Sequence, residues 1–134
     1  MSNLFQKSKF NIDAAEELIK KSLHAPSVHC SYYACFQFLK FTLKNFQNLT
    51  YDYIESECRI YPGGTHGYII DNCLNEFRKK VDFSKFKDIK RELKDLKDFR
   101  IDSDYYDKEI IIDESEKCLA LSKNIISEIK KNLK

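Results

Sequence analysis

The sequence of 134 residues is poor in the residues that build turns. It contains 3 glycines, 2 prolines and no tryptophan. So few turn-forming residues favour a small number of long elements over many short strands. The N-terminal sequence MSNLFQKSKFN lacks the apolar run of a secretory signal, and no stretch approaches the roughly 18 apolar residues of a membrane span. We therefore expect a cytoplasmic protein with one domain, residues 1–134, that does not contact a membrane.

Motifs that hold metals, phosphates or cofactors are also missing. The five cysteines are odd in number, and no two of them form a CxxC pair. This pattern is typical of reduced, buried thiols rather than of a disulfide framework or a zinc site. The three histidines are spread along the chain, and there is no GxxxxGK[ST], GxGxxG, HExxH or GxSxG motif. We therefore expect neither a metal nor a cofactor.

The charge of the chain is nearly balanced. It has 23 basic and 21 acidic residues, which gives a formal net charge of +2. A chain with this balance does not attract nucleic acid through its overall electrostatic field. Any contact with RNA would have to be made by a local group of residues.

The segment 28–46 is apolar on two sides when its residues are placed on a helix. The first stripe recurs at spacings of three and four residues and consists of Val28, Tyr32, Cys35, Phe36, Leu39, Leu43 and Phe46. The second stripe lies nearly opposite and consists of Cys30, Ala34, Phe38 and Phe41. A helix with two apolar sides does not lie on the surface of a small domain. It is either the central helix of a bundle, or it packs inward with one stripe and binds a partner with the other.

Four further segments each have one apolar stripe, which predicts amphipathic helices near residues 3–22, 65–80, 84–100 and 113–133. Thr65, Ser84 and Asp113 are the expected N-terminal caps, the last in a capping box with Glu116. Between residues 47 and 64 the pattern breaks, and only a short helix over residues 51–57 fits. The mixed charges of residues 85–98 are typical of a solvated helix face. Together these segments predict an all-α fold, an up-and-down bundle of four to five helices.

Arg100 continues the apolar stripe of the fourth predicted helix, four residues after Leu96. A cation in an apolar stripe needs a partner. Asp104, at i+4, or a carboxylate on a neighbouring helix would satisfy it, and an external anion would do so equally well. The segment RIDSDYY places further polar groups at the end of this helix: Asp102, Asp104, Tyr105 and Tyr106. The residues alone leave a structural and a functional role for Arg100 equally open.

Three short elements of the chain resemble those of small prokaryotic HEPN proteins (higher eukaryote and prokaryote nucleotide-binding domains). SYYACFQFLK resembles the YYAMFH-type helix of that family. His66-Gly67 resembles the HG that opens its third helix, and RIDSDY, from Arg100 to Tyr105, resembles its R-x-x-x-D-Y element. The closing helix after Asp113 also fits, so the resemblance covers most of the chain in the right order.

The resemblance implies a HEPN-like helical bundle that pairs as a homodimer, with the second stripe as the candidate interface: Cys30, Ala34, Phe38 and Phe41. Many HEPN domains are metal-independent ribonucleases, whose motif is an arginine followed, after four to six residues, by a histidine. Arg100 matches that arginine. The three spacings place Tyr105, Tyr106 and Asp107 at the histidine position. Tyrosine, with a pKa of about 10, is a poor general base near neutral pH. The ribonuclease motif is therefore incomplete.

Four hypotheses about function follow. The favoured one is a HEPN-domain protein of a toxin–antitoxin or phage-defence module. It would bind RNA, a nucleotide or a protein partner such as an antitoxin, through Arg100, Asp104, Tyr105 and Tyr106. The second is a metal-independent endoribonuclease in which His66 replaces the missing base beside Arg100. The third is a partner of a small nucleotidyltransferase that modifies Tyr105 or Tyr106. In the fourth, Arg100 only forms a salt bridge within the chain.

Overall fold

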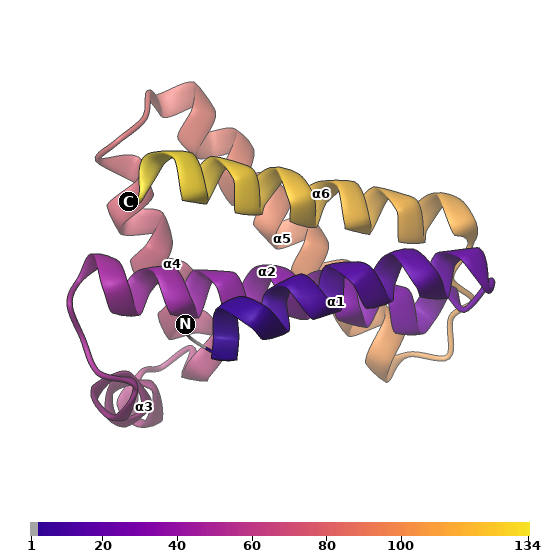
Figure 1. The fold of residues 1–134 in the computed structure, drawn as a ribbon, viewed down its shortest axis with the longest axis horizontal. Helices are drawn as coiled ribbons and strands as arrows, with labels where there is room; N and C mark the ends of the chain where they lie inside the picture. Colours follow the sequence, from indigo (N-terminus) through magenta and orange to yellow (C-terminus); the bar gives the residue numbers. More distant parts are fainter. Residues whose placement is uncertain (1–2) are drawn as a thin grey trace.

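The computed structural model describes residues 3–134, and these form six helices without a strand (Figure 1). In chain order the helices are α1 (Asn3–Lys20), α2 (His24–Phe46), α3 (Tyr51–Ile60), α4 (Gly64–Arg78), α5 (Phe83–Tyr105) and α6 (Ile112–Asn132). The prediction of an all-α helical bundle is confirmed. The predicted number of helices is too low, because the segment 51–60 forms a complete helix. The Thr50 side chain caps that helix, and Ile54 and Cys58 are buried one turn apart.

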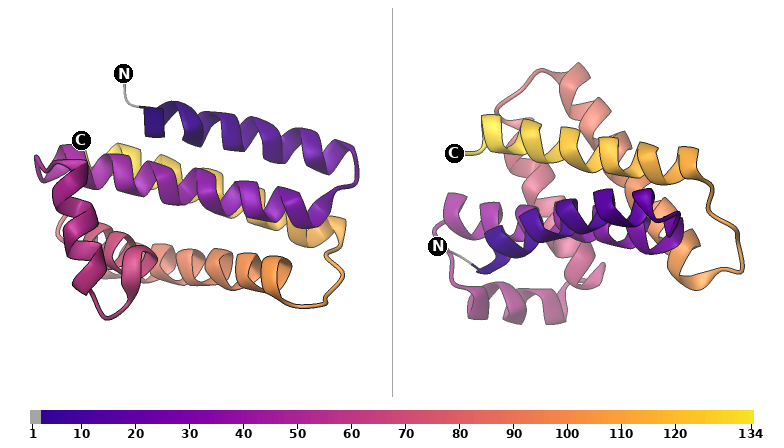
Figure 2. Two further views of the ribbon diagram at one scale, coloured as in Figure 1. Left: turned by 90° about the horizontal axis from the view of Figure 1, so that it is seen from below. Right: turned by 45° about the vertical axis from the view of Figure 1, so that its right-hand side comes forward.

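Helices α1, α2 and α6 run along the length of the molecule, and α5 crosses them obliquely (Figure 1). The left view of Figure 2 shows three layers: α1 on one side, α2 with α6 in the middle, and α5 on the other side. The short helices α3 and α4 lie at the end of the molecule where α2 ends. The chain therefore passes from one outer layer to the other through the middle layer.

Helix α2 is the central helix, as its two apolar stripes predict, and it packs against α1, α4, α5 and α6. Val28 and Tyr32 of the first stripe are almost completely buried in the core, together with Leu39 and Leu43. The helix begins at His24, slightly earlier than expected. Proline is accepted in the first turn of a helix, where its missing N–H has no intrahelical partner to lose.

The second stripe of α2 is covered by α1 of the same chain. Ala34 is 0% exposed and Phe38 is 5% exposed. The ring of Phe5, in α1, lies 6.4 Å from the ring of Phe38 and 5.2 Å from that of Phe41. Cys30 is partly buried. Helix α1 therefore occupies the face that the sequence assigned to a homodimer interface, and the burial of this stripe requires no second subunit.

Small side chains line the contact between α1 and α2. The hydroxyl of Ser8 donates a hydrogen bond to the Ala34 carbonyl at 2.6 Å, and that of Ser27 donates to the Ala15 carbonyl at 2.9 Å. Each hydroxyl thus finds its partner on the opposite helix, which satisfies a buried polar group. Ser8 lies in the apolar stripe of α1, three residues after Phe5 and four before Ile12, but the sequence does not show which carbonyl accepts its hydrogen bond.

The N-cap of α5 lies two residues before its predicted position. Asp82, and not Ser84, is the N-cap, and its carboxylate accepts a hydrogen bond from the Lys85 backbone N–H at 2.8 Å. We expect Asp82→Ala to lower the free energy of unfolding by about 1 kcal/mol, because the Lys85 amide loses its acceptor. Ser84→Ala is the matched control and should change it by less than about 0.5 kcal/mol. Urea denaturation followed by circular dichroism measures both, and a larger loss for Ser84→Ala would contradict this assignment.

The starts of α4 and α6 also differ from the prediction. Helix α4 begins one residue before the cap expected at Thr65. At the start of α6, the Glu114 carboxylate accepts a hydrogen bond from the Ile111 backbone N–H at 3.3 Å. The predicted capping box of Asp113 and Glu116 is therefore wrong, because the helix begins earlier and Glu114 takes the role expected of Glu116.

Candidate functional site

Arg100 lies near the end of α5 and is 6% exposed. Three aromatic rings surround its guanidinium. The Cζ atom lies 4.8 Å from the ring centroid of Tyr32, 5.7 Å from that of Tyr33 and 5.8 Å from that of Tyr105. Cation–π contacts of this kind stabilise a guanidinium that has been removed from water. Arg100 is therefore held in an aromatic cage built by α2 and by the end of its own helix.

The chain only partly satisfies the hydrogen-bonding groups of Arg100. Its Nη1 atom lies 3.8 Å from the Asp104 Oδ2 atom, which is beyond hydrogen-bond distance. The same oxygen lies 2.9 Å from His29 Nδ1, so Asp104 is shared between two groups. Within residues 3–134, the buried Nε of Arg100 has no hydrogen-bond partner. The guanidinium therefore has an N–H group without an acceptor, which could donate a hydrogen bond to an anion from outside the chain.

His66, in the first turn of α4, reaches the same cluster through Tyr32. Its Nδ1 atom lies 2.6 Å from the Tyr32 hydroxyl. Its ring stacks on Phe36 with a centroid distance of 4.3 Å and an interplanar angle of 22°. Tyr32 thus contacts Arg100 through its ring and His66 through its hydroxyl. The structure brings Arg100 and His66, the two residues predicted as catalytic, to one tyrosine.

The surroundings of His66 keep its imidazole neutral. Burial, together with the positive charges of Arg100 and Lys97, lowers the pKa of His66 to about 4. Burial raises the pKa of the Tyr32 phenol, although the charge of Arg100 opposes this change. At neutral pH the pair is therefore a neutral imidazole and a protonated phenol. An imidazole with so low a pKa is a weak general base at that pH.

The predicted tyrosines after Arg100 have different surroundings. Tyr105, the last residue of α5, is 70% exposed and still faces the guanidinium of Arg100. Tyr106 lies beyond the helix, is 65% exposed and makes no ring contact with Arg100 in the part of the chain that the structure describes. The hydroxyl of Ser103 donates a hydrogen bond to the Ala25 carbonyl at 2.9 Å, which ties the end of α5 to the start of α2.

Sequence reasoning missed three members of the cluster: His29, Tyr32 and Tyr33. Tyr32 belongs to the first apolar stripe of the segment 28–46, and nothing in the sequence indicates that His29 contacts Asp104. Their spacing contains a signal, because residues three and four apart share a helix face. The His29 and Tyr33 rings lie 4.6 Å apart. A histidine followed by two tyrosines at this spacing, with an unpartnered arginine elsewhere, would have suggested the contact.

We also searched the described residues for a metal site, a membrane span and paired cysteines. Among residues 3–134 there is no group of three or more His, Cys, Asp or Glu side chains that could hold a metal ion. No helix in that range combines the length and apolar character needed to cross a membrane. All five cysteines are free, and four of them are buried: Cys35, Cys58, Cys73 and Cys118. Their burial agrees with the apolar helix positions that they occupy in the sequence.

The three elements that resemble HEPN proteins meet around Arg100. They contribute Tyr32 and Tyr33 from α2, His66 from α4, and Arg100 with its neighbours from α5. Comparison with known proteins found no matching protein-family model and no significant match among curated proteins or solved structures. The resemblance to HEPN proteins therefore rests on these three elements of the sequence.

Proposed function

We propose that this chain is a HEPN-type protein of a toxin–antitoxin or phage-defence module, and that Arg100 binds a phosphate group of RNA or of a nucleotide. One observation carries the phosphate-binding part of the proposal, and the family and the module rest on the resemblance of the sequence. Arg100 is almost completely buried, yet its Nε has no hydrogen-bond partner among the described residues, and its nearest carboxylate oxygen lies 3.8 Å away. A buried charged group with unused donors is destabilising, and a bound anion would remove this cost. The planar guanidinium matches the geometry of a phosphate.

The side chains around Arg100 suit a nucleotide better than a simple anion. Tyr105 is largely exposed beside the guanidinium, and Tyr33 is partly exposed. Exposed aromatic rings next to a cation allow a base to stack while its phosphate binds the cation. Lys97 adds a positive charge on this side, and Asp104 offsets part of it. These features favour RNA or a nucleotide as the ligand.

The endoribonuclease alternative has one observation in its favour, since His66 and Arg100 contact the same tyrosine. A general base is most effective when its pKa lies near the pH of the reaction. The pKa of His66 is lowered to about 4, and its Nδ1 is engaged by the Tyr32 hydroxyl. Binding without efficient cleavage is therefore the preferred function.

Fluorescence anisotropy with a labelled single-stranded RNA, and separately with a labelled adenine nucleotide, tests the proposal. We expect Arg100→Met to weaken binding about tenfold, because methionine keeps much of the apolar stem and removes the charge-assisted hydrogen bonds. Arg59→Met is the matched control, since Arg59 is exposed in α3, away from the cluster. It should bind like the wild type.

Two outcomes would change this assignment. Equal affinities of the wild type and of folded Arg100→Met would remove Arg100 from the binding site. Gel electrophoresis of the same RNA after incubation tests the alternative. Cleavage by the wild type that is lost in both Arg100→Met and His66→Gln would favour the endoribonuclease.

A further inference from the structure

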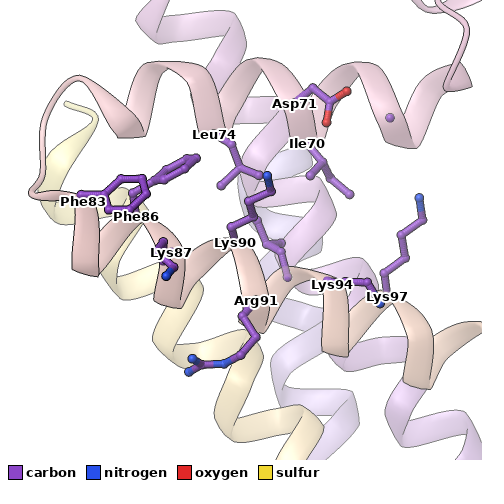
Figure 3. A pocket seen from close by; sticks show the side chains of 12 residues that line it. Ile70, Asp71, Leu74, Phe83, Phe86, Lys87, Lys90, Arg91, Lys94 and Lys97 are labelled. Atoms are coloured by element: carbon purple, nitrogen blue, oxygen red, sulfur yellow. The ribbon is translucent and has the colours of Figure 1, made fainter.

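A groove of about 640 Å³ runs between α4 and α5 and does not include Arg100. Figure 3 shows Ile70 and Leu74 of α4 pointing into the gap towards α5. Phe86 and Leu93 of α5 complete an apolar lining. An apolar groove between two helices is a common docking site for a third helix.

The rim of the groove is strongly basic. The cations that line it all come from α5: Lys87, Lys90, Arg91, Lys94 and Lys97. Asp71 of α4 is the one carboxylate in the lining, and its oxygen already accepts a hydrogen bond from the Tyr61 hydroxyl at 2.6 Å. In the part of the chain that the structure describes, Lys87, Lys90 and Lys97 have no carboxylate partner within 4.0 Å. Arg91 and Lys94 pair with Asp88 at 3.4 Å and with Asp98 at 2.9 Å, so three of the five rim cations lack a matching negative charge among the described residues.

The rim cations have the spacing of a helix face. Lys87, Lys90, Lys94 and Lys97 are three, four and three residues apart along α5, which places them in one row about 15 Å long. Ile70 and Leu74 are one turn apart on α4. A helix laid into the groove could point its apolar side chains at this floor and a row of carboxylates at the lysines.

Single-stranded nucleic acid fits the groove less well. Such ligands stack their bases on exposed aromatic faces. The two phenylalanines in the lining already carry cations: Lys87 Nζ lies 5.6 Å from the Phe83 ring centroid, and Lys90 Nζ lies 5.9 Å from that of Phe86. The rest of the floor is aliphatic and offers no flat surface to a base. Charge and shape together favour a peptide.

We propose that the groove between α4 and α5 binds an acidic amphipathic helix of a partner protein. This docking site is separate from Arg100, which does not line the groove, although Lys97 lies beside both sites. Its specificity comes from matching carboxylates to the unpaired lysines, and its affinity from the apolar floor.

A synthetic peptide with leucines at i, i+3, i+4 and i+7, flanked by glutamates, serves as the probe in fluorescence anisotropy. We expect the wild type to bind it, and Lys87→Glu with Lys90→Glu to weaken binding about tenfold through charge repulsion. The control carries the same charge change at Lys21→Glu with Lys131→Glu, two exposed lysines outside the groove. It should keep the affinity of the wild type. A peptide with lysines in place of the glutamates should bind the variant with Lys87→Glu and Lys90→Glu more tightly than it binds the wild type.

Several results would overturn the proposal: no binding of the acidic peptide, equal binding by the groove variant, or equal loss in the control variant. RNA binding that depends on Lys87 and Lys90, without peptide binding, would assign the groove to nucleic acid. Self-association that the groove variant abolishes would assign it to a second copy of the chain. Arg100→Met must leave peptide binding unchanged, so failure at one site is distinguishable from failure at the other.

Discussion

Phe38→Glu is expected to leave the chain largely unfolded. Phe38 is 5% exposed and lies among the rings of Phe5 and Phe41, beneath α1. The substitution removes a large apolar side chain and places a carboxylate in the contact between α1 and α2, among the rings of Phe5 and Phe41. We expect it to lower the free energy of unfolding by about 4 kcal/mol or more. That is a large part of the roughly 5–15 kcal/mol that stabilises an ordinary domain.

Phe10→Glu is the matched control, because Phe10 lies on the outer side of α1 and is 64% exposed. It should change the free energy of unfolding by about 0.5 kcal/mol or less. Circular dichroism and urea denaturation measure both variants. Size-exclusion chromatography with light scattering, applied to the wild type, also tests the proposed homodimer. A folded Phe38→Glu with the urea midpoint of the wild type would show that α1 does not hold this face closed.

Acid is expected to destabilise the protein through His66. In the unfolded chain a histidine takes up its proton near pH 6.5, whereas the folded protein protonates His66 only near pH 4. Between these values the unfolded state binds more protons, so the stability falls as the pH falls. The contribution of His66 is complete above about pH 6.5 and is lost on approaching pH 4. Because the ring is only partly buried, we expect His66 to contribute about 1 to 2 kcal/mol to the free energy of unfolding.

Urea denaturation of the wild type and of His66→Gln at a series of pH values isolates this contribution. Carboxylates elsewhere titrate in both proteins, so the difference between the two curves belongs to His66. Glutamine can still accept a hydrogen bond from the Tyr32 hydroxyl, which limits other changes. An NMR titration of the His66 ring measures its pKa directly. A midpoint near 6.5, or identical pH dependence of the two proteins, would contradict the environment described for His66.

The two proposed sites differ in how far their charges are exposed to water. Arg100 is enclosed by aromatic rings, so a ligand there gains from a guanidinium that water scarcely reaches. The lysines of the groove are solvated, so their contribution should decrease at high salt. Salt dependence of RNA binding and of peptide binding, measured side by side, would show this difference.

The helices could be predicted because their signal is local. Each repeats its apolar residues every three or four positions, and the backbone hydrogen bonds of a helix link residues four apart. The two stripes of α2 predicted its central position in the same way. Helix α3 was harder to predict, since it is short and only Ile54 and Cys58 mark its buried side. The cap at Ser84 failed because Asp82, two residues earlier, takes that role. The caps at Thr65 and Asp113 failed because α4 and α6 begin after Gly63 and Ile111, neither of which makes a cap hydrogen bond through its side chain.

The candidate site was only partly visible in the sequence. The burial of Arg100 followed from its place in an apolar stripe, and its approach to Asp104 followed from their separation of four residues. The mixed charges of α5 gave no sign of the groove. The lysines at 87, 90, 94 and 97 form one row on α5, but this row borders an apolar groove only because α4 packs beside it.

The sequence by itself therefore determined the helical class, the central role of α2 and the buried position of Arg100. Tertiary structure decided what each face meets: that α1 covers Phe38, that Tyr32 joins Arg100 to His66, and that lysines border an apolar groove. The physical reason is the range of the interactions. Helix periodicity is set by neighbours along the chain, whereas these contacts join residues far apart in the sequence and depend on how whole helices pack.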